Sequence, residues 1–447
     1  MERLLHYVWK YKLYLPTALT LTDGRPLRIL DPGSADPSGA PFFRNARIQI
    51  GETPLAGSVE IVGNAASAPL SGWGYVAKQD GAPRAILRVR SCPEEIPFSS
   101  LLRAAEDTPP PEPGQTPGDE PVPEAELPVP GGLSRTIAWL LESTEPIACR
   151  ERIKEVGPLH LSLWLGALVG ERLKRKTDEI AALLRTYGND WNEVFYIIFT
   201  RYFGFGSLNA AFEALARSLP LRCIRKQRGS QTQVEALLLG QAGLLEDPID
   251  NAYYRLLQRE YRFLCHKFDL RQPHPTLAEC LRNRPYAFPH LKLAQLAAVW
   301  QTHDTLFSAI LEAGTLGEIK KFFHVLPSAY WETHYHFRAA SAPKRKPLGE
   351  TALHILLINT VVPMLFAYGR HTKLPEYTER AVRLLENLPP EKNSIVTAFG
   401  RAGVPVQHAA DSQALIQLKR EYCEHKRCLD CRIGFQLLKI SLSRIQV

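Results

Sequence analysis

Residues 104–132 read AAEDTPPPEPGQTPGDEPVPEAELPVPGG, and this stretch divides the chain into two parts of different character. It carries nine prolines and seven acidic residues, has no basic residue, and offers few side chains that could build a core. Such a composition cannot bury enough apolar surface to offset the entropy that is lost on ordering. We therefore predict an extended or disordered acidic linker over 104–132, which limited proteolysis should cut first.

The part before the linker, residues 1–103, is rich in short β-prone runs separated by turn signals. Polar and apolar residues alternate clearly in Arg47–Ile50 and in Ile86–Val89, as expected for half-buried strands. A small mixed or antiparallel sheet with a short helix at its start is therefore predicted. The helix is expected over Glu2–Tyr11 and the strands over Pro26–Leu30, Ala46–Ile50, Gly57–Val62 and Ala85–Val89.

The part after the linker, residues 133–447, has apolar residues at helical spacing. Asp190 is a suitable N-cap for a helix over Trp191–Phe203, with Glu193 as its capping-box partner. Pro363 should kink the helix that contains it. The fold class is therefore α+β, a small N-terminal mixed β-sheet domain followed by a large mainly α-helical domain. The other helices are expected over Leu161–Arg185, Ser207–Ser218, Gln233–Leu244, Asn251–Lys267, Leu291–Ala313, Leu348–Tyr368, Pro375–Leu388 and Asp411–Glu424.

Three of the eight cysteines, Cys423, Cys428 and Cys431, stand within nine residues in the run CEHKRCLDC near the C-terminus. Thiols this close, without a secretory signal, usually bind metal or do redox chemistry rather than form structural disulfides. Zinc and 4Fe–4S sites generally need four ligands, so the fourth is either Cys149 or His425. We favour a zinc or 4Fe–4S site with Cys149; redox-active thiols and ordinary helix-end cysteines are the alternatives.

The net charge of +8 understates how basic the folded parts are, because the linker is acidic. A basic surface favours polyanionic partners, nucleic acid first. Three clusters that combine cations with aromatic residues suit single-stranded or flexible nucleic acid, although solvated loops also have this composition. Their cations are Arg222, Arg225, Lys226 and Arg228; Arg282 and Arg284; and Lys344, Arg345 and Lys346.

Several classes of protein find no support in the sequence. The N-terminus has no apolar signal-peptide region, and the longest apolar stretch, Leu353–Tyr368, is shorter than the ~20 residues that cross a bilayer. We expect a cytoplasmic protein that does not bind membranes. No phosphate-binding glycine motif occurs, so no nucleotide cofactor is predicted.

Motifs spread along the chain point to a known group of proteins. They include D-P-G at 31–33, G-S-V-E-I at 57–61, N-D-W-N-E-V-F-Y at 189–196 and the C-terminal signature Y-C-x4-C-L-x-C-x-I-G. Together they resemble an uncharacterised bacterial family that is common in Bacteroidetes and known as a domain of unknown function. The resemblance covers nearly the whole chain apart from the linker, and it implies no established activity.

The N-terminal pattern of that family, a Pro-Asp followed by Glu-x-basic on a nearby strand, looks like the metal-binding core of restriction-endonuclease-like nucleases. In such a core two carboxylates hold Mg²⁺ and a basic residue two positions on helps to orient water. Here Glu60 remains, but Phe42 stands where the aspartate is expected and Val62 where the basic residue is expected. Trp73 falls where the family has a histidine. The resemblance therefore implies a degenerate nuclease-like domain with a vestigial Glu60.

These expectations combine into one hypothesis for the whole chain. Residues 1–103 form a degenerate nuclease-like domain, 104–132 a linker, and 133–447 a helical domain closed by a cysteine site. The favoured function is non-catalytic nucleic-acid binding or scaffolding. The alternatives are an active metal-dependent nuclease that uses Glu60 and a purely structural protein–protein interaction module.

Overall fold

The computed structural model describes residues 2–14, 19–35, 42–62, 85–91, 123–127, 131–274, 276–278 and 289–444. The chain folds as two units, unit 1 (1–161 and 420–447) and unit 2 (162–419). This division differs from the predicted one, because the boundary falls inside helix α3 (Pro158–Thr186) and the C-terminal segment returns to unit 1. Most of the predicted linker lies outside the described residues.

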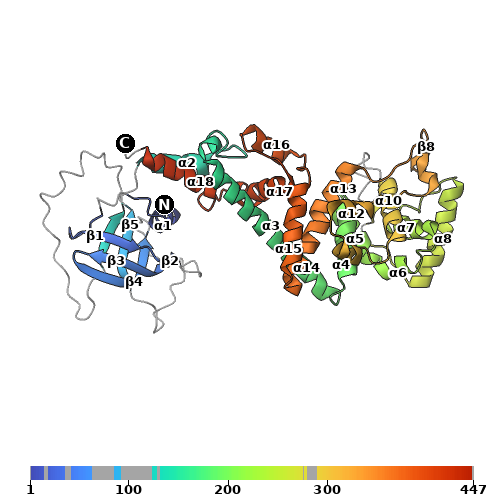
Figure 1. Cartoon of the computed structure of the whole chain (residues 1–447), viewed down its shortest axis with the longest axis horizontal. Helices are drawn as coiled ribbons and strands as arrows, with labels where there is room; N and C mark the ends of the chain where they lie inside the picture. The colour runs from blue at the N-terminus through green and yellow to red at the C-terminus, as the bar shows by residue number, and fades with distance from the viewer. Residues whose placement is uncertain are drawn as a thin grey trace. The chain divides into compact units, whose positions relative to one another are not determined.

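Unit 1 is built on a mixed sheet with the strand order β1-β3-β4-β5-β6, and β2 pairs with β3 (Figure 1). β1, β3 and β4 pair antiparallel, whereas β4, β5 and β6 pair parallel. Phe43, Val59 and Leu87 are partners across three neighbouring strands and are buried, so they form part of the core of the unit. The strands are β1 (Leu27–Asp31), β2 (Ser34–Ala35), β3 (Phe42–Ile50), β4 (Thr53–Val62), β5 (Ala85–Ser91) and β6 (Glu124–Leu127).

Strand β6 lies within the segment that was predicted to be a linker. It pairs with β5 and buries Ala125 and Leu127, and Pro123 directly precedes it. Proline is tolerated at strand ends because no ladder amide is required there. The composition of the segment is that of a linker, but these four residues gain a partner strand far away in the sequence.

The helices of unit 1 come from both ends of the chain and from the segment after β6. α18 packs against α2, where Thr136 donates a hydrogen bond of 3.0 Å to the Ser441 hydroxyl. The ring of Phe435 also lies 4.8 Å from that of Tyr11, centroid to centroid. These contacts explain why the C-terminus belongs to unit 1. The helices are α1 (Glu2–Lys10), α2 (Gly131–Glu142), the 3₁₀ helix η2 (Ile153–Glu155) and α18 (Arg432–Ser443).

Unit 2 is almost entirely helical, as predicted, and its core contains Trp300, Trp331 and Phe199. Among its described residues, one small sheet pairs two short strands. The elements after α3 are α4 (Trp191–Tyr202), α5 (Asn209–Ser218), α6 (Leu221–Arg225), α7 (Gln231–Gln241), α8 (Ala252–Phe268), α10 (Pro289–Thr302), α11 (Leu306–Glu312), α12 (Leu316–Lys321), η3 (Ala329–Glu332), β7 (His334–His336), β8 (Ala339–Ala340), α13 (Glu350–Leu356), η4 (Leu357–Val361), α14 (Val362–Thr372), α15 (Pro375–Asn387), α16 (Ser394–Arg401) and α17 (Ala409–Leu418). The π-helix η5 (Lys419–Cys423) follows α17, and all of it but Lys419 belongs to unit 1.

The start of α4 confirms one part of the capping prediction and corrects another. The Asp190 carboxylate accepts hydrogen bonds from the backbone N–H groups of Asn192 and Glu193, both at 3.0 Å, so it is the N-cap. Glu193 does not complete a capping box with Asp190. Its carboxylate instead accepts from the N–H of Leu221 at 3.1 Å, which ties the start of α6 to α4.

Two predicted helices are interrupted. The helix expected over Leu291–Ala313 is two helices, α10 and α11, because the chain turns at residues 303–305, where Arg225 donates to the Asp304 carbonyl at 2.9 Å. The helix around Pro363 changes type rather than breaking. A π-helix, η4, directly precedes α14, and a π-helical turn can accommodate the missing proline N–H.

The stretch from Glu350 to Thr372 is long and apolar enough to span a membrane by length and composition, within the residues that the structure describes. In the folded chain 72% of its most apolar window is buried inside the protein. Its apolar residues Leu353, Val361 and Leu365 pack in the core of unit 2. This arrangement is that of a core helix.

Candidate functional site

Glu60, the carboxylate that the sequence singled out, lies in a row of charged side chains across three strands. Register pairs it with Arg88 on β5, and Arg88 with Glu124 on β6. The Arg88 guanidinium donates from Nε to Glu60 at 2.9 Å and from Nη1 to Glu124 at 3.2 Å. The hydrogen bond to Glu60 is the main cause that raises the pKa of Arg88 above its ordinary value, and the hydrogen bond to Glu124 adds to it. Arg88 therefore stays charged and holds both carboxylates.

The row leaves little room for the two-carboxylate metal site of a nuclease. Phe42 is the register partner of Glu60 on β3, so the neighbouring strand supplies no carboxylate opposite it. Glu124 stands two strands away, with Arg88 on the strand between them. A divalent metal binds its carboxylate oxygens directly, and here the Arg88 guanidinium is hydrogen-bonded to both carboxylates. The sequence reading missed Arg88 and Glu124, although the alternation around Arg88 was visible in Ile86–Val89. The region of Trp73 lies outside the described residues.

The four cysteines of the predicted metal site lie in three segments of unit 1. Cys149 stands in tight turns before η2, where its carbonyl accepts from the N–H of Arg152 at 3.0 Å. Cys423 is the last residue of η5. Cys428 follows in a turn, and Cys431 is the N-cap residue of α18 and only 7% exposed. None of the four cysteines is part of a disulfide bond.

The surroundings of Cys149 tie these segments together. Desolvation raises the pKa of the Cys149 thiol well above its ordinary value, and the nearby thiols of Cys431, Cys423 and Cys428 raise it further. His425, the alternative fourth ligand, is exposed. Cys149 therefore lies near the three C-terminal thiols, whereas His425 faces solvent, and the choice of a fourth ligand stays a prediction.

The position of Cys428 depends on close packing against two helices. Its thiol lies 3.5 Å from the carbonyl oxygen of Leu140 near the end of α2. On the other side, a side chain at Gly434 would place its Cβ only 2.0 Å from the carbonyl oxygen of Cys428. Glycine in the first turn of α18 is thus what lets the cysteine turn lie against the helix.

The thiols do not form a finished metal site. In the described part of the chain, no group of three or more His, Cys, Asp or Glu side chains is arranged to hold a metal ion. Metal binding at Cys149, Cys423, Cys428 and Cys431 would therefore require their side chains to move closer to one another. Whether they do so stays a prediction.

The basic clusters of unit 2 divide into structural and exposed cations. Arg225 and Arg228 lie 3.3 and 3.4 Å from the Asp304 carboxylate, so both hold the turn between α10 and α11. Lys346 is 7% exposed, and its Nζ donates to the carbonyl oxygens of Trp331 and Glu332 at 2.7 and 2.9 Å. These three cations therefore stabilise the folded chain through contacts with other parts of unit 2. The exposed members are Arg222, Lys226, Lys344 and Arg345, whereas Arg282 and Arg284 lie outside the described residues.

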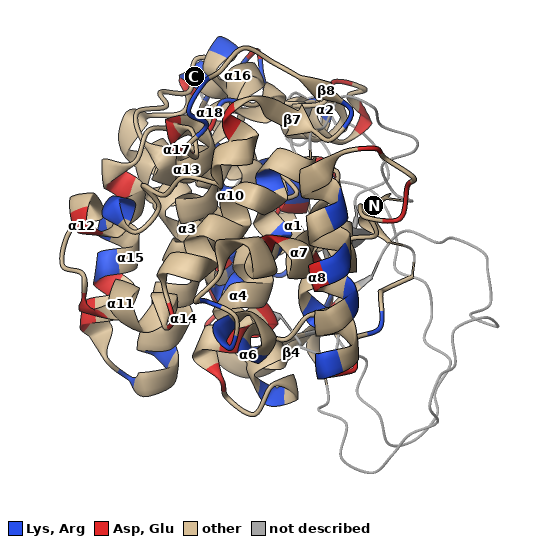
Figure 2. Cartoon of the chain, turned by 90° about the vertical axis from the view of Figure 1, so that its right-hand side faces the viewer, with Lys and Arg blue, Asp and Glu red and all other residues tan. Residues whose placement is uncertain are grey.

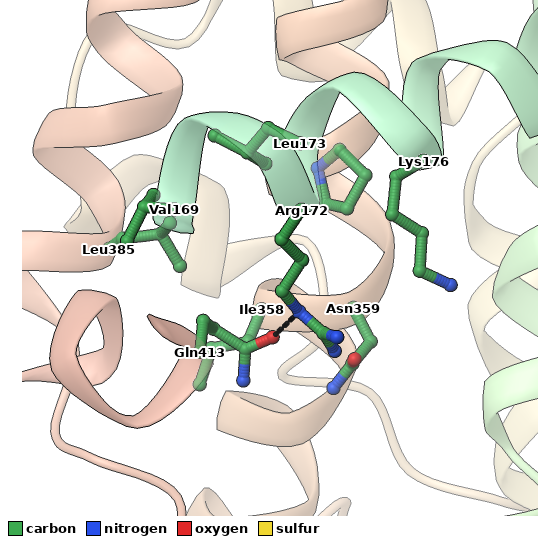
Figure 3. A pocket seen from close by; sticks show the side chains of 9 residues that line it. Val169, Arg172, Leu173, Lys176, Ile358, Asn359, Leu385 and Gln413 are labelled. Carbon is green, nitrogen blue, oxygen red and sulfur yellow. Dashed lines mark hydrogen bonds between the residues drawn. The ribbon is translucent and has the colours of Figure 1, made fainter. Parts of the chain in front are cut away.

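A small pocket in unit 2 lies beside the π-helix η4 and between α3, α15 and α17 (Figure 3). Arg172, which is buried, donates from Nε to the Gln413 side-chain oxygen at 2.6 Å (Figure 3). The amide nitrogen of Gln413 is buried and has no hydrogen-bond partner within the described chain. The pocket has room for about one water molecule, so it suits a bound water rather than a substrate.

Comparison with models of protein families gives a match. The model of a family described as a protein of unknown function (DUF2851) matches residues 2–67 and 115–394. The match agrees with the resemblance found in the sequence, but the cysteine run at 423–431 lies beyond the matched residues. No curated protein and no solved structure matches the chain.

Proposed function

We propose that this chain, which belongs to the DUF2851 family, is a non-catalytic nucleic-acid-binding protein whose sheet domain is a degenerate nuclease-like core. The observation that carries the proposal is the placement of Arg88 between Glu60 and Glu124. A guanidinium that is hydrogen-bonded to both carboxylates occupies them as a metal ion would, yet it cannot activate water as a metal does. The sheet keeps a row of charged side chains where the active site is expected, but no group in this row activates water as a metal would.

Exposed cations on unit 2 support the nucleic-acid part of the proposal. Arg222 and Lys226 lie at and after α6, and Lys344 and Arg345 lie in the segment before α13; all four side chains are exposed. Exposed cations of this kind neutralise phosphates and release counterions, so binding depends strongly on salt. The net charge of +8 favours such polyanionic partners.

Binding and cleavage assays on the full chain test the proposal. We expect affinity for DNA or RNA oligonucleotides to fall steeply as salt rises from about 50 to 200 mM, and no cleavage with Mg²⁺ or Mn²⁺. Glu60→Gln should bind like the parent protein, as should Glu52→Gln, a control at an exposed carboxylate in the β3–β4 turn. Metal-dependent cleavage that is lost in Glu60→Gln alone would establish a nuclease instead. If the protein does not bind nucleic acid even at low salt, the proposal fails and a structural protein–protein interaction module becomes the better explanation.

As a second candidate function we propose a metal site at the four cysteines of unit 1, which is supported by the effect of the three C-terminal thiols on the pKa of Cys149. Four thiolates suit zinc or a 4Fe–4S cluster, because both take soft sulfur ligands. Such a site would fasten the C-terminal segment to the turns before η2. Its role would be structural, in line with a non-catalytic protein.

Metal analysis of anaerobically purified protein tests this second proposal. We expect about one zinc ion per chain, or iron and sulfide with broad visible absorption, and loss of the metal in Cys149→Ser and Cys428→Ser. Cys265→Ser is the matched control, because Cys265 is a free cysteine of unit 2. The site is refuted if the parent protein contains no metal. It is also refuted if Cys149→Ser and Cys428→Ser retain the metal as the Cys265→Ser control does.

A further inference from the structure

Helix α8 of unit 2 presents a row of cations to solvent. Its buried residues Tyr254, Leu257 and Leu264 face the rest of the unit, where α8 packs against α7. Cations line the opposite face of the helix in Figure 2, where they are coloured blue. The residues exposed on this outer face are Arg255, Arg259, Arg262, Phe263, His266 and Lys267.

Few acidic side chains on α8 neutralise this row of cations. Glu260 is the one acidic residue within α8; it is partly buried and accepts a hydrogen bond of 3.0 Å from Gln233. Arg255 is paired with Asp250, just before the helix. Arg259 and Arg262 have no ion-pair partner in the part of the chain that the structure describes. Their charges are available to a ligand.

Helix stability alone does not account for the row. Cations near a helix C-terminus favour the helix dipole, which explains His266 and Lys267 in the last turn. Arg259 and Arg262 lie in the middle of the helix, where the dipole effect has faded. Three arginines at positions 255, 259 and 262 follow one helical face, so their alignment presents a continuous positive surface about 18 Å long up to Lys267.

An exposed aromatic ring lies within the row. Phe263 is 59% exposed, although it is surrounded by charged residues one helical turn away. The ammonium group of Lys267 lies 5.9 Å from the centre of the Phe263 ring. A ring flanked by cations is the combination that binds unpaired bases, because the ring stacks on a base while the cations contact its phosphates.

We propose that the outer face of α8 binds single-stranded nucleic acid, with Arg259 and Arg262 on phosphates and Phe263 stacked on a base. This inference rests on the proposed function. It adds which surface of the protein binds, and that the bound nucleic acid is single-stranded. A membrane surface fits less well. An amphipathic helix binds lipid by inserting its apolar face, and here Tyr254, Leu257 and Leu264 are buried within the protein. Unpaired bases fit better than a duplex, since stacking needs an open base face.

Fluorescence anisotropy with a labelled oligo-dT and the full chain tests the site over a range of salt concentrations. Arg259→Ala/Arg262→Ala is expected to bind at least 10-fold more weakly, with a salt slope shallower by about 1.4. Phe263→Ala is expected to lose roughly 5- to 150-fold at every salt concentration without a change in slope. Phe263→Trp should restore stacking and with it the affinity.

Controls separate the site from the proposed function. Arg383→Ala/Lys392→Ala removes the same charge from exposed positions in and after α15 and should bind like the parent protein. All substituted residues are exposed, and circular dichroism should show an unchanged fold. If the parent protein binds oligo-dT and the α8 variants bind equally well, the α8 site is wrong while the proposed function stands. If the parent protein binds neither oligo-dT nor an RNA oligonucleotide at low salt, both the α8 site and the proposed function fail. Binding to phosphatidylserine vesicles that the α8 variants lose, without oligo-dT binding, would assign the face to membranes.

Discussion

Replacement of Trp331 by alanine is expected to lower the free energy of unfolding of unit 2 by about 3–5 kcal/mol, the range for large aromatic residues in cores. The Trp331 side chain is fully buried and packs against Phe337, with ring centroids 5.4 Å apart. Its indole N–H also donates to the Glu235 carboxylate at 2.8 Å. Because domains are stable by only about 5–15 kcal/mol, the loss should bring unit 2 close to unfolding.

The hydrogen bond to Glu235 makes this tryptophan more than a filler of volume. Glu235 is fully buried and has no basic partner among the residues that the structure describes, and desolvation raises the pKa of its carboxyl group. Besides Trp331, it accepts from the Tyr253 hydroxyl at 2.8 Å and from the N–H of Ser328 at 3.2 Å. Removal of the indole leaves a buried acceptor with one donor fewer, at a cost of about 1–3 kcal/mol.

Urea unfolding followed by circular dichroism measures the effect, and Trp331→Phe separates its two causes. Phenylalanine keeps most of the ring but cannot donate to Glu235, so we expect a loss of about 1–3 kcal/mol for this variant. The alanine variant should be clearly less stable than the phenylalanine variant. Equal stability of the parent and alanine proteins would show that Trp331 is not part of the core.

Substitution of Gly434 by alanine is expected to destabilise unit 1 by about 1–3 kcal/mol or more, the cost of an overpacked contact. The added Cβ would lie 2.0 Å from the Cys428 carbonyl oxygen and 3.0 Å from its carbonyl carbon. The obstacle is backbone, which cannot rotate away as a side chain can. Either α18 or the cysteine turn must shift, and Cys428 would move with it.

Thermal unfolding and the rate of thiol modification together test this second prediction. Gly434→Ala should unfold at a lower temperature and expose Cys428 to faster modification. Gly157→Ala is the control in unit 1, because its nearest neighbour to an added Cβ would be the His160 ring nitrogen at 3.6 Å, an ordinary contact. A Gly434→Ala protein with parental stability and thiol reactivity would contradict the close approach.

Local patterns in the sequence predicted most elements of the fold. Short β-prone runs between turn signals located β1, β3, β4 and β5, and helical spacing located the main helices, because both depend on residues close in the chain. The same reasoning assigned Glu124–Leu127 to a linker. Its prolines and acids are the local signal, whereas its pairing with β5 depends on a strand more than 30 residues away.

The candidate site shows the same limit. The sequence drew attention to Glu60 and to the cysteine run, since the motif and the spacing are local. The hydrogen bonds of Arg88 to Glu60 and Glu124 follow from strand register, which no local pattern specifies. The division into units likewise depends on which faces α2 and α18 bury against each other, and amphipathicity reveals a buried face but not its partner.

The sequence by itself determined the fold class, the positions of most strands and helices, and the basic character of the chain. Only the tertiary structure decided which cations serve the fold and which face solvent. Arg225, Arg228 and Lys346 belong to basic clusters in the sequence, yet the first two hold Asp304 and the third binds backbone carbonyls. Arg259 and Arg262 attracted no notice in the sequence but lie exposed on α8. The physical reason is that a charge is a property of one residue, whereas its availability depends on partners that folding brings from elsewhere in the chain.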